Sequence, residues 1–346
     1  MNDRTRKVGV GILGAGFMGK TYAETVTKMV NRAELIGVAC GSRSGALAEE
    51  YGVAHFDGVE DLLASPGIDA VFIATPHSAH AEQAIACAEA GKHILIEKPM
   101  ASSVEDCDRI LEACDKHSVH STIAFSQRTR VCNRAAKELL DSGKLGKIHH
   151  IRTCQTVPGG MPNLPKWQME KENLGTLFGH AIHNFDAVRW LTGGEIATVY
   201  AKCRSTDPAV TTEGTADVLM TVDTGATAYL LCSFQLPKPG FPRSGYAFQA
   251  ICENGLLDID AYGEARASIG GGEWETIAAQ EPIDWQGKGA LDPVRLESYS
   301  LHINDFISSI LEGRPPAITG WDGRQAVAAA LAAYISNETG EEVRLS

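Results

Sequence analysis

The stretch Val8–Gly19, with the sequence VGVGILGAGFMG, decides how the first half of the chain folds. Its first six residues are aliphatic or glycine and predict a short buried strand, while Lys20–Val30 has the pattern of a helix. Between them lies the motif Gly-x-Gly-x-x-Gly, which in this context binds the pyrophosphate of a dinucleotide at a helix N-terminus. Such a turn needs glycine for its tightness, for close approach of the phosphates and for packing of the helix on the strand. The candidate cofactor contacts in this turn are Gly14, Gly16, Phe17, Met18 and Gly19.

Strands and helices alternate through the rest of the first 126 residues. We expect strands at Glu34–Ala39, Ala70–Ala74, His93–Glu97 and Val119–Phe125, and helices at Ser78–Gly91 and Val104–Lys116. This alternation predicts the α/β class, with a parallel, doubly wound sheet of the Rossmann type. Residues 1–126 are therefore expected to form a dinucleotide-binding domain.

The residues that follow the predicted strands Glu34–Ala39 and Ala70–Ala74 bear on the choice of cofactor. A carboxylate at the end of the second strand would bind the ribose hydroxyls of NAD, but this chain has Ser42 and Arg43 there. A guanidinium and a hydroxyl suit a 2′-phosphate, so the loop favours NADP over NAD. Thr75, Pro76 and His77 follow the third strand at the same sheet edge and are further candidate cofactor contacts.

From about Gln127 the pattern changes to successive strands separated by short turns. Such a pattern predicts a C-terminal α+β domain, residues 127–346, with an open and mostly antiparallel sheet. The strands are expected at Ile148–Thr156, Ala197–Cys203, Ala216–Val222, Thr227–Phe234, Tyr246–Cys252, Gly255–Ile259, Ala265–Ile269 and Glu342–Leu345, and the helices at Val131–Ser142, Gly179–Thr192, Arg295–Glu312 and Asp322–Asn337. An open sheet leaves one face to bury, which predicts a homo-oligomer, a dimer or a tetramer. The C-terminal segment is a candidate for packing back on the first domain.

The composition excludes several classes of protein. The chain has 346 residues, 44% of them hydrophobic, and a formal net charge of −12, which argues against a nucleic-acid partner. No apolar run approaches the roughly 20 residues that cross a bilayer, so no membrane partner is expected. The N-terminus lacks the apolar core of a signal peptide, and the nine cysteines form no paired motif. Both observations favour a cytoplasmic protein with reduced thiols.

Lys98 lies at a position where ligands bind in α/β sheets. It belongs to Gly91–Met100, GKHILIEKPM, in which Pro99 stops the predicted strand directly after Lys98. The carboxyl ends of parallel strands form the ligand-binding edge of such a sheet, so Glu97 and Lys98 are candidate cofactor contacts. The alternative is a solvated lysine at a strand end.

A second informative stretch is Asn173–Leu191, NLGTLFGHAIHNFDAVRWL. On one predicted helix, His180, His183 and Asp186 are three residues apart and share a side. This arrangement indicates either proton transfer or a metal site. Because no further cluster of ligands is evident, no metal is expected.

The ordered set of these motifs resembles the glucose–fructose oxidoreductase/inositol dehydrogenase (Gfo/Idh/MocA) family. The motifs are Gly14-Ala15-Gly16-Phe17-Met18-Gly19, Glu97-Lys98-Pro99, Gly175…His183…Asp186, and the tail Phe306…Gly313-Arg314-Pro315-Pro316…Gly340. The resemblance implies a nicotinamide-dependent oxidoreductase that acts on a sugar, a polyol or a related alcohol. It also implies that Lys98 and His183 are catalytic, with His183 as the base and Lys98 as its electrostatic partner, or with these roles exchanged.

This chain departs from the family's usual histidine segment, in which an aspartate stands at the position of Gly179. The departure bears on the identity of the substrate, and His180 is a candidate replacement for the aspartate. The candidate substrate contacts are Lys98, Arg128, Trp167, His180, His183 and Asp186. Arg128 is equally a candidate for a structural strut.

Two other functions remain open from the sequence. One is the same chemistry used transiently, with a retained cofactor, for elimination, epimerisation or glycoside cleavage. The other is a non-catalytic nucleotide-binding regulatory protein.

Overall fold

The computed structural model describes residues 6–164, 174–207 and 212–345. The chain divides into two compact units, each built from two segments of sequence. The first unit comprises Met1–Ser126 and Ile283–Arg324, and the second comprises Gln127–Pro282 and Gln325–Ser346. The boundaries of the units therefore depend on C-terminal residues as well as on the change of pattern near Gln127.

The first unit contains a six-stranded sheet in the order β3-β2-β1-β4-β5-β6, and all of its strand pairs are parallel. This is the doubly wound order that the alternation of strands and helices predicts, so the predicted fold class is confirmed. The order reverses between β1 and β4, which places the carboxyl ends of these two strands at the switch point. The strands are β1 (Val8–Leu13), β2 (Ala33–Ala39), β3 (Ala54–His55), β4 (Ala70–Ile73), β5 (His93–Ile96) and β6 (Ser121–Ile123).

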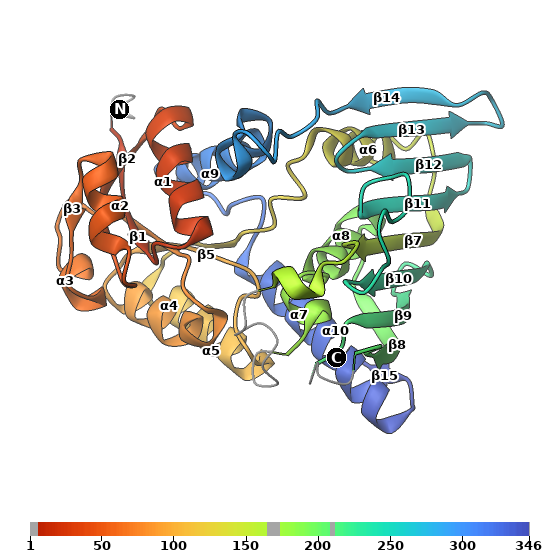
Figure 1. Cartoon of the computed structure of the whole chain (residues 1–346), viewed down its shortest axis with the longest axis horizontal. Coiled ribbons are helices and arrows are strands. Elements are labelled where there is room, and N and C mark those ends of the chain that lie inside the picture. The colour runs from red at the N-terminus through yellow and green to blue at the C-terminus, as the bar shows by residue number, and fades with distance from the viewer. Residues whose placement is uncertain (1–5, 165–173, 208–211, 346) are drawn as a thin grey trace. The chain divides into compact units, whose positions relative to one another are not determined.

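Helices cover both faces of this sheet (Figure 1). In the view of Figure 1, α1 (Phe17–Met29) and α9 (Pro293–Glu312) lie together on one face, and α4 (His80–Glu89) and α5 (Val104–His117) lie on the other. The shorter helices are α2 (Ser44–Tyr51), α3 (Val59–Leu63), and the 3-10 turns η1 (His77–Ala79) and η5 (Gly289–Leu291).

Helix α9 is part of the core of the first unit although it lies late in the sequence. Its residues Ile303, Phe306 and Ile307 are buried in one cluster with Val10 of β1 and Phe72 of β4. The helix begins at an Asp292 cap, whose carboxylate accepts a hydrogen bond from Val294 N at 2.9 Å, and it ends at Gly313 with φ 67°. Strong signals at both ends explain why its predicted range is nearly correct.

The second unit contains a nine-stranded sheet in the order β14-β13-β12-β11-β7-β10-β9-β8-β15. Only β7 and β10 pair in parallel, so the sheet is mostly antiparallel, as predicted. The strands are β7 (Ile148–Thr156), β8 (Ile196–Arg204), β9 (Thr215–Val222), β10 (Thr227–Ser233), β11 (Tyr246–Cys252), β12 (Gly255–Asp260), β13 (Glu264–Ile269), β14 (Glu275–Ala279) and β15 (Val343–Arg344). The sequence did not predict β14, because its mixed polar sequence at a sheet edge has no clear alternation.

The helices of the second unit lie on one side of this sheet (Figure 1). They are α6 (Val131–Asp141), α7 (Thr176–Gly179), α8 (Ile182–Thr192) and the later part of α10 (Gly320–Thr339); the 3-10 turn η2 spans Met161–Asn163. The other face carries exposed apolar side chains, among them Leu219 at 51% exposure and Ile251. In the described part of the chain, no helix is both long and apolar enough to cross a membrane.

The predicted helix at Gly179–Thr192 is present as α8, but it begins three residues later, at Ile182, and a separate short helix, α7, precedes it. The backbone N–H groups of His180 and Ala181 both bond to the carbonyl of Thr176, at 2.9 and 3.1 Å, which ends the regular hydrogen-bond ladder of α7. Helix α8 then starts anew with Ala181 as its N-cap. His180 therefore does not share a helix with His183 and Asp186.

Candidate active site

The glycine turn after β1 has the geometry that a dinucleotide requires. Gly14 has φ +102°, and a Cβ there would lie 2.6 Å from the carbonyl oxygen of Ala74, so a side chain is excluded. A Cβ on Gly19 would lie 2.0 Å from the carbonyl oxygen of Gly14, which explains the close packing of α1 on the turn. By contrast, a Cβ on Gly16 would meet only Arg43 Nη2, at 3.8 Å. The space in front of Gly16 and the uncapped N-terminus of α1 fits a pyrophosphate.

Arg43 extends toward this turn from the end of β2. The backbone bends sharply there, with Cys40 at φ 66° and Gly41 at φ 89°, and Arg43 then forms the N-cap of α2. Ser42 and Arg43 are both exposed, and the guanidinium lies near the open side of Gly16. A cation at this position suits a phosphate group.

Phe17 and Met18, in the variable positions of the turn, contact Arg295 of α9. Phe17 is 56% exposed, and the Arg295 guanidinium lies 4.7 Å from the centre of its ring. The same guanidinium donates to Thr21 Oγ1 at 3.0 Å and contacts Met18 Sδ at 3.6 Å. Sequence reasoning missed Arg295, which is 274 positions from Thr21 and belongs to no motif. It holds α9 against the start of α1.

The ends of β4 and β5 are tied together by a buried histidine. His80 Nε2 lies 2.9 Å from the carbonyl oxygen of Thr75, and its Nδ1 lies 2.9 Å from that of Pro99. His77 is buried beside it, and burial, together with the neighbouring His80 and Lys98, lowers the pKa of His77 to about 4. With this pKa, His77 is neutral at physiological pH.

Lys98 lies two residues after the end of β5 and is half-buried. The adjacent Glu97 is buried and accepts hydrogen bonds from Tyr22 Oη at 2.5 Å and from the Lys98 backbone N–H at 3.1 Å. Burial raises the pKa of Glu97, and the nearby Lys98 ammonium opposes that shift. The Tyr22–Glu97 pair thus anchors the backbone of Lys98 to α1.

His183 lies in the first turn of α8, in the second unit. Its ring is partly buried and meets the ring of Tyr246 edge-on, with 6.4 Å between the ring centres. The Tyr246 hydroxyl donates to the His183 carbonyl oxygen at 3.1 Å, and the next residue, Asn184, donates to Thr153 Oγ1 at 2.7 Å. Strands β7 and β11 of the sheet therefore hold the start of α8 in place. His180 instead packs against the ring of Phe234, with 4.6 Å between ring centres.

Arg128 and Asp186, both candidate substrate contacts, bind each other. Arg128 Nε donates to Asp186 Oδ2 at 2.8 Å and Nη2 donates to Oδ1 at 2.5 Å, which is a bidentate ion pair. The two side chains are 9% and 1% exposed. This pair joins the segment after β6 to α8 within the second unit. Trp167, another candidate contact, lies outside the described residues.

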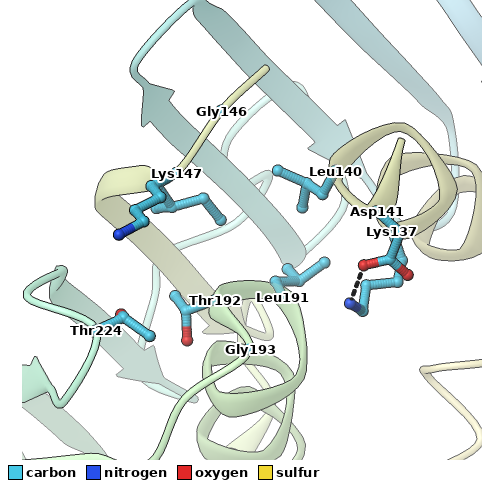
Figure 2. Close-up of a pocket in the computed structure, with 10 residues that line it drawn as sticks. Lys137, Leu140, Asp141, Gly146, Lys147, Leu191, Thr192, Gly193 and Thr224 are labelled. Carbon is cyan, nitrogen blue, oxygen red and sulfur yellow. Dashed lines mark hydrogen bonds and ion pairs between the residues drawn. The ribbon is translucent and has the colours of Figure 1, made fainter. Parts of the chain in front are cut away.

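A separate pocket of about 280 Å³ lies in the second unit, where the ends of α6 and α8 meet the start of β7 (Figure 2). It shares no residue with the candidate site. Its lining comprises Lys137, Leu140, Asp141, Gly146, Lys147, Ile148, Leu191, Thr192, Gly193 and Thr224.

Within the described ranges, no group of three or more histidine, cysteine, aspartate or glutamate side chains is arranged to hold a metal ion.

The sheet order and the glycine turn define the first unit as a dinucleotide-binding Rossmann fold. Comparison with known families agrees and specifies the kind of protein. Residues 8–125 match the family described as an oxidoreductase family with an NAD-binding Rossmann fold, and residues 133–258 match the GFO/IDH/MocA C-terminal domain. The chain belongs to the Gfo/Idh/MocA family of oxidoreductases, and its first unit is a Rossmann domain of that family's NAD-binding type.

Several relatives that match nearly the whole chain are named as inositol dehydrogenases. The myo-inositol 2-dehydrogenase of Thermotoga maritima is 27% identical, over 97% of this chain and 98% of its own length. The scyllo-inositol 2-dehydrogenase (NAD(+)) of Bacillus subtilis is also 27% identical, over 98% of this chain and 96% of its own. Among solved structures, the aldose-aldose oxidoreductase of Caulobacter crescentus, complexed with glycerol, is 26% identical with a TM-score of 0.82, and the match covers 98% of this chain and all of that one.

Proposed function

We propose that this protein interconverts a secondary alcohol and a ketone on a sugar or cyclic polyol, using a nicotinamide cofactor. The observation that carries the proposal is the position of Lys98, which follows β5 at the same sheet edge as the glycine turn. Ligands bind at that edge in doubly wound sheets, so an ammonium group there can contact the reacting alcohol oxygen. The inositol dehydrogenases among the relatives support a polyol as the substrate class.

The turn Gly14–Gly19 would hold the cofactor's pyrophosphate, and Arg43 would bind an adenosine 2′-phosphate where NADP is used. The remaining proposed cofactor contacts are Ser42, Thr75, Pro76, His77 and Glu97. When bound, the nicotinamide accepts or donates the hydride. The proposed preference for NADP rests on Arg43 and on the lack of a carboxylate after β2.

We propose that His183 accepts the hydroxyl proton of the alcohol and that Lys98 stabilises the developing oxyanion. An alcohol that loses hydride must also lose its hydroxyl proton, and a positioned imidazole accelerates such a step by on the order of 10²–10⁴. A fixed ammonium beside the same oxygen lowers the barrier electrostatically. His180, Arg128 and Asp186 remain proposed substrate contacts, although the bidentate pair makes a positioning role the better-supported one for the last two.

The experiment that tests this function is a substrate panel with matched lysine variants. Inositols, aldoses and their keto forms are incubated with NAD or NADP, and absorbance at 340 nm is followed. Lys98→Met should reduce turnover by at least 10²-fold while the cofactor dissociation constant changes less than twofold. Lys92→Met is the matched control, because Lys92 lies before the opposite end of the same strand and donates to the carbonyl of Ile68.

Near-normal turnover in Lys98→Met would refute the assigned role of the lysine. Product formation without any net change at 340 nm, from protein that retains its cofactor, would favour the transient use of oxidation instead. Absence of turnover across the panel would contradict the proposed substrate class.

A further inference from the structure

We infer that Glu213 and Tyr334 are positioning residues that fix the short helix α7 and, through it, the histidine segment. This inference rests on the proposed role of His183. Neither residue belongs to a motif that the sequence analysis singled out, and both lie outside the glycine turn and the lysine strand.

Helix α7 spans only Thr176–Gly179, so it cannot be stable without contacts from other elements. Its N-cap, Gly175, provides no side chain, yet the N–H groups of a first helical turn need acceptors. In the described chain these acceptors come from two distant elements. Glu213 precedes β9, and Tyr334 belongs to α10.

One carboxylate oxygen and one hydroxyl oxygen accept hydrogen bonds from the backbone N–H groups at the start of α7. Glu213 Oε1 accepts from Leu177 N at 2.6 Å and from Tyr334 Oη at 3.0 Å. The Tyr334 hydroxyl in turn accepts from Gly175 N at 3.1 Å and lies 3.3 Å from Phe178 N. The phenol therefore bridges the carboxylate and the backbone, and removing its hydroxyl breaks three hydrogen bonds at once.

The carboxyl group of Glu213 also explains the glycine at position 175. A Cβ on Gly175 would lie 1.9 Å from Glu213 Oε2 and 2.2 Å from its Cδ. Glu213 itself is 6% exposed, and burial raises the pKa of its carboxyl, while the hydrogen bonds from Leu177 and Tyr334 act in the opposite direction. A buried, hydrogen-bonded carboxyl packed against a glycine is a rigid arrangement.

The Glu213–Tyr334 pair, called here the α7 cap, is linked to the start of α8 through one residue. Thr176, which lies next to Glu213, accepts hydrogen bonds from the N–H groups of both His180 and Ala181. Ala181 is the N-cap of α8 and accepts from Asn184 N at 2.8 Å, so its position sets the direction of the turn that carries His183. Because Tyr246 and Asn184 hold α8 from the sheet as well, loss of the cap should displace the histidine slightly without unfolding the helix.

The test compares two tyrosine variants of the whole protein. Tyr334→Phe removes the bridging hydroxyl and leaves the ring. Tyr229→Phe is the matched control, because in the same unit it likewise removes a tyrosine hydroxyl that donates to a carboxylate, that of Asp217 at 2.6 Å. Glu213→Gln is the second variant, which keeps the shape of the side chain and removes its charge.

Two measurements do not depend on activity. Hydrogen exchange, followed by mass spectrometry, should become at least tenfold faster in residues 174–184 of Tyr334→Phe and remain unchanged in Tyr229→Phe. The rate at which diethyl pyrocarbonate modifies His183 should change at least twofold in the same variant. Wild-type exchange in both Tyr334→Phe and Glu213→Gln would overturn the inference, even if both variants were less active.

The catalytic consequence is measured with myo-inositol, or with the substrate that the panel identifies. In Tyr334→Phe, kcat should fall about tenfold, whereas the cofactor dissociation constant should stay within twofold, since the glycine turn belongs to the other unit. Faster exchange with an unchanged kcat would refute positioning. If the wild type turns over no tested substrate, the proposed function fails, and exchange together with His183 modification still decides whether the cap fixes the segment.

Discussion

Replacing Asp186 by asparagine tests whether the buried ion pair with Arg128 is a structural strut of the second unit. Both hydrogen bonds are short, at 2.8 and 2.5 Å, and the side chains are 9% and 1% exposed. The carboxylate also lies 3.9 Å from Arg189, which has its own partner in Glu195. Asparagine keeps the shape of the side chain, but it removes the charge and turns an N–H group toward the guanidinium.

The expected cost follows from the burial of the pair. Removing one partner of a buried ion pair costs about 3–5 kcal/mol, because the remaining charge stays desolvated without compensation. For a unit of this size, 1 kcal/mol corresponds to roughly 2–4 °C, so Asp186→Asn should lower Tm by about 6 °C or more. The Arg128 guanidinium also lies 5.8 Å from the centre of the Trp190 ring, a contact that the substitution does not remove.

Differential scanning calorimetry of the whole protein measures this shift. The control is Asp141→Asn, which removes the exposed pair between Lys137 and Asp141 on α6 (Figure 2) and should cost less than about 1 kcal/mol. A double variant, Arg128→Met with Asp186→Leu, should regain most of the lost stability, because an apolar pair of similar volume avoids the stranded charge. A shift below 2 °C in Asp186→Asn, combined with a raised KM, would refute the strut and assign Asp186 to the substrate.

Three further predictions concern the cofactor, the assembly and the pH dependence. Arg43→Ala should raise the KM for NADP about tenfold and change that for NAD less than twofold, because only the 2′-phosphate loses a charged partner; steady-state kinetics with both cofactors would show it. Leu219→Asp, on the exposed sheet face, should reduce the molar mass seen by light scattering if that face joins subunits, whereas Lys144→Asp beyond the end of α6 should not. The pKa of His77 is lowered from 6.5 to about 4, so the unfolded chain binds this proton first, and stability should fall by up to about 3 kcal/mol as the pH drops from 6.5 to 4. In denaturant titrations His77→Gln should flatten that slope in part, since His93, with a pKa also lowered to about 4, keeps its contribution.

Elements whose signals are local could be predicted from the sequence. The glycine turn, the strand that ends shortly before Pro99 and the capped helix α9 each carry their own start or stop residues. The alternation of strands and helices predicted the parallel sheet, and the successive strands with short turns predicted the mostly antiparallel one.

The features that could not be predicted depend on partners far away in the sequence. Glu213 and Tyr334 accept hydrogen bonds from N–H groups at the start of α7, and both lie far outside Asn173–Leu191 in the sequence. The pairing of Arg128 with Asp186 likewise joins residues 58 positions apart. A pattern could place these residues on an element, but only the packed structure shows that two candidate ligand contacts satisfy each other.

Helix α9 has a practical consequence for anyone who dissects this protein. Ile303, Phe306 and Ile307 complete the core around Val10 and Phe72. A fragment that ends at Ser126 would therefore expose an apolar surface along the sheet and would be prone to aggregate. An autonomous nucleotide-binding module would need residues 283–324 spliced back on through an artificial linker. On the ribosome, too, the first unit must wait for nearly the whole polypeptide before its hydrophobic interior can close.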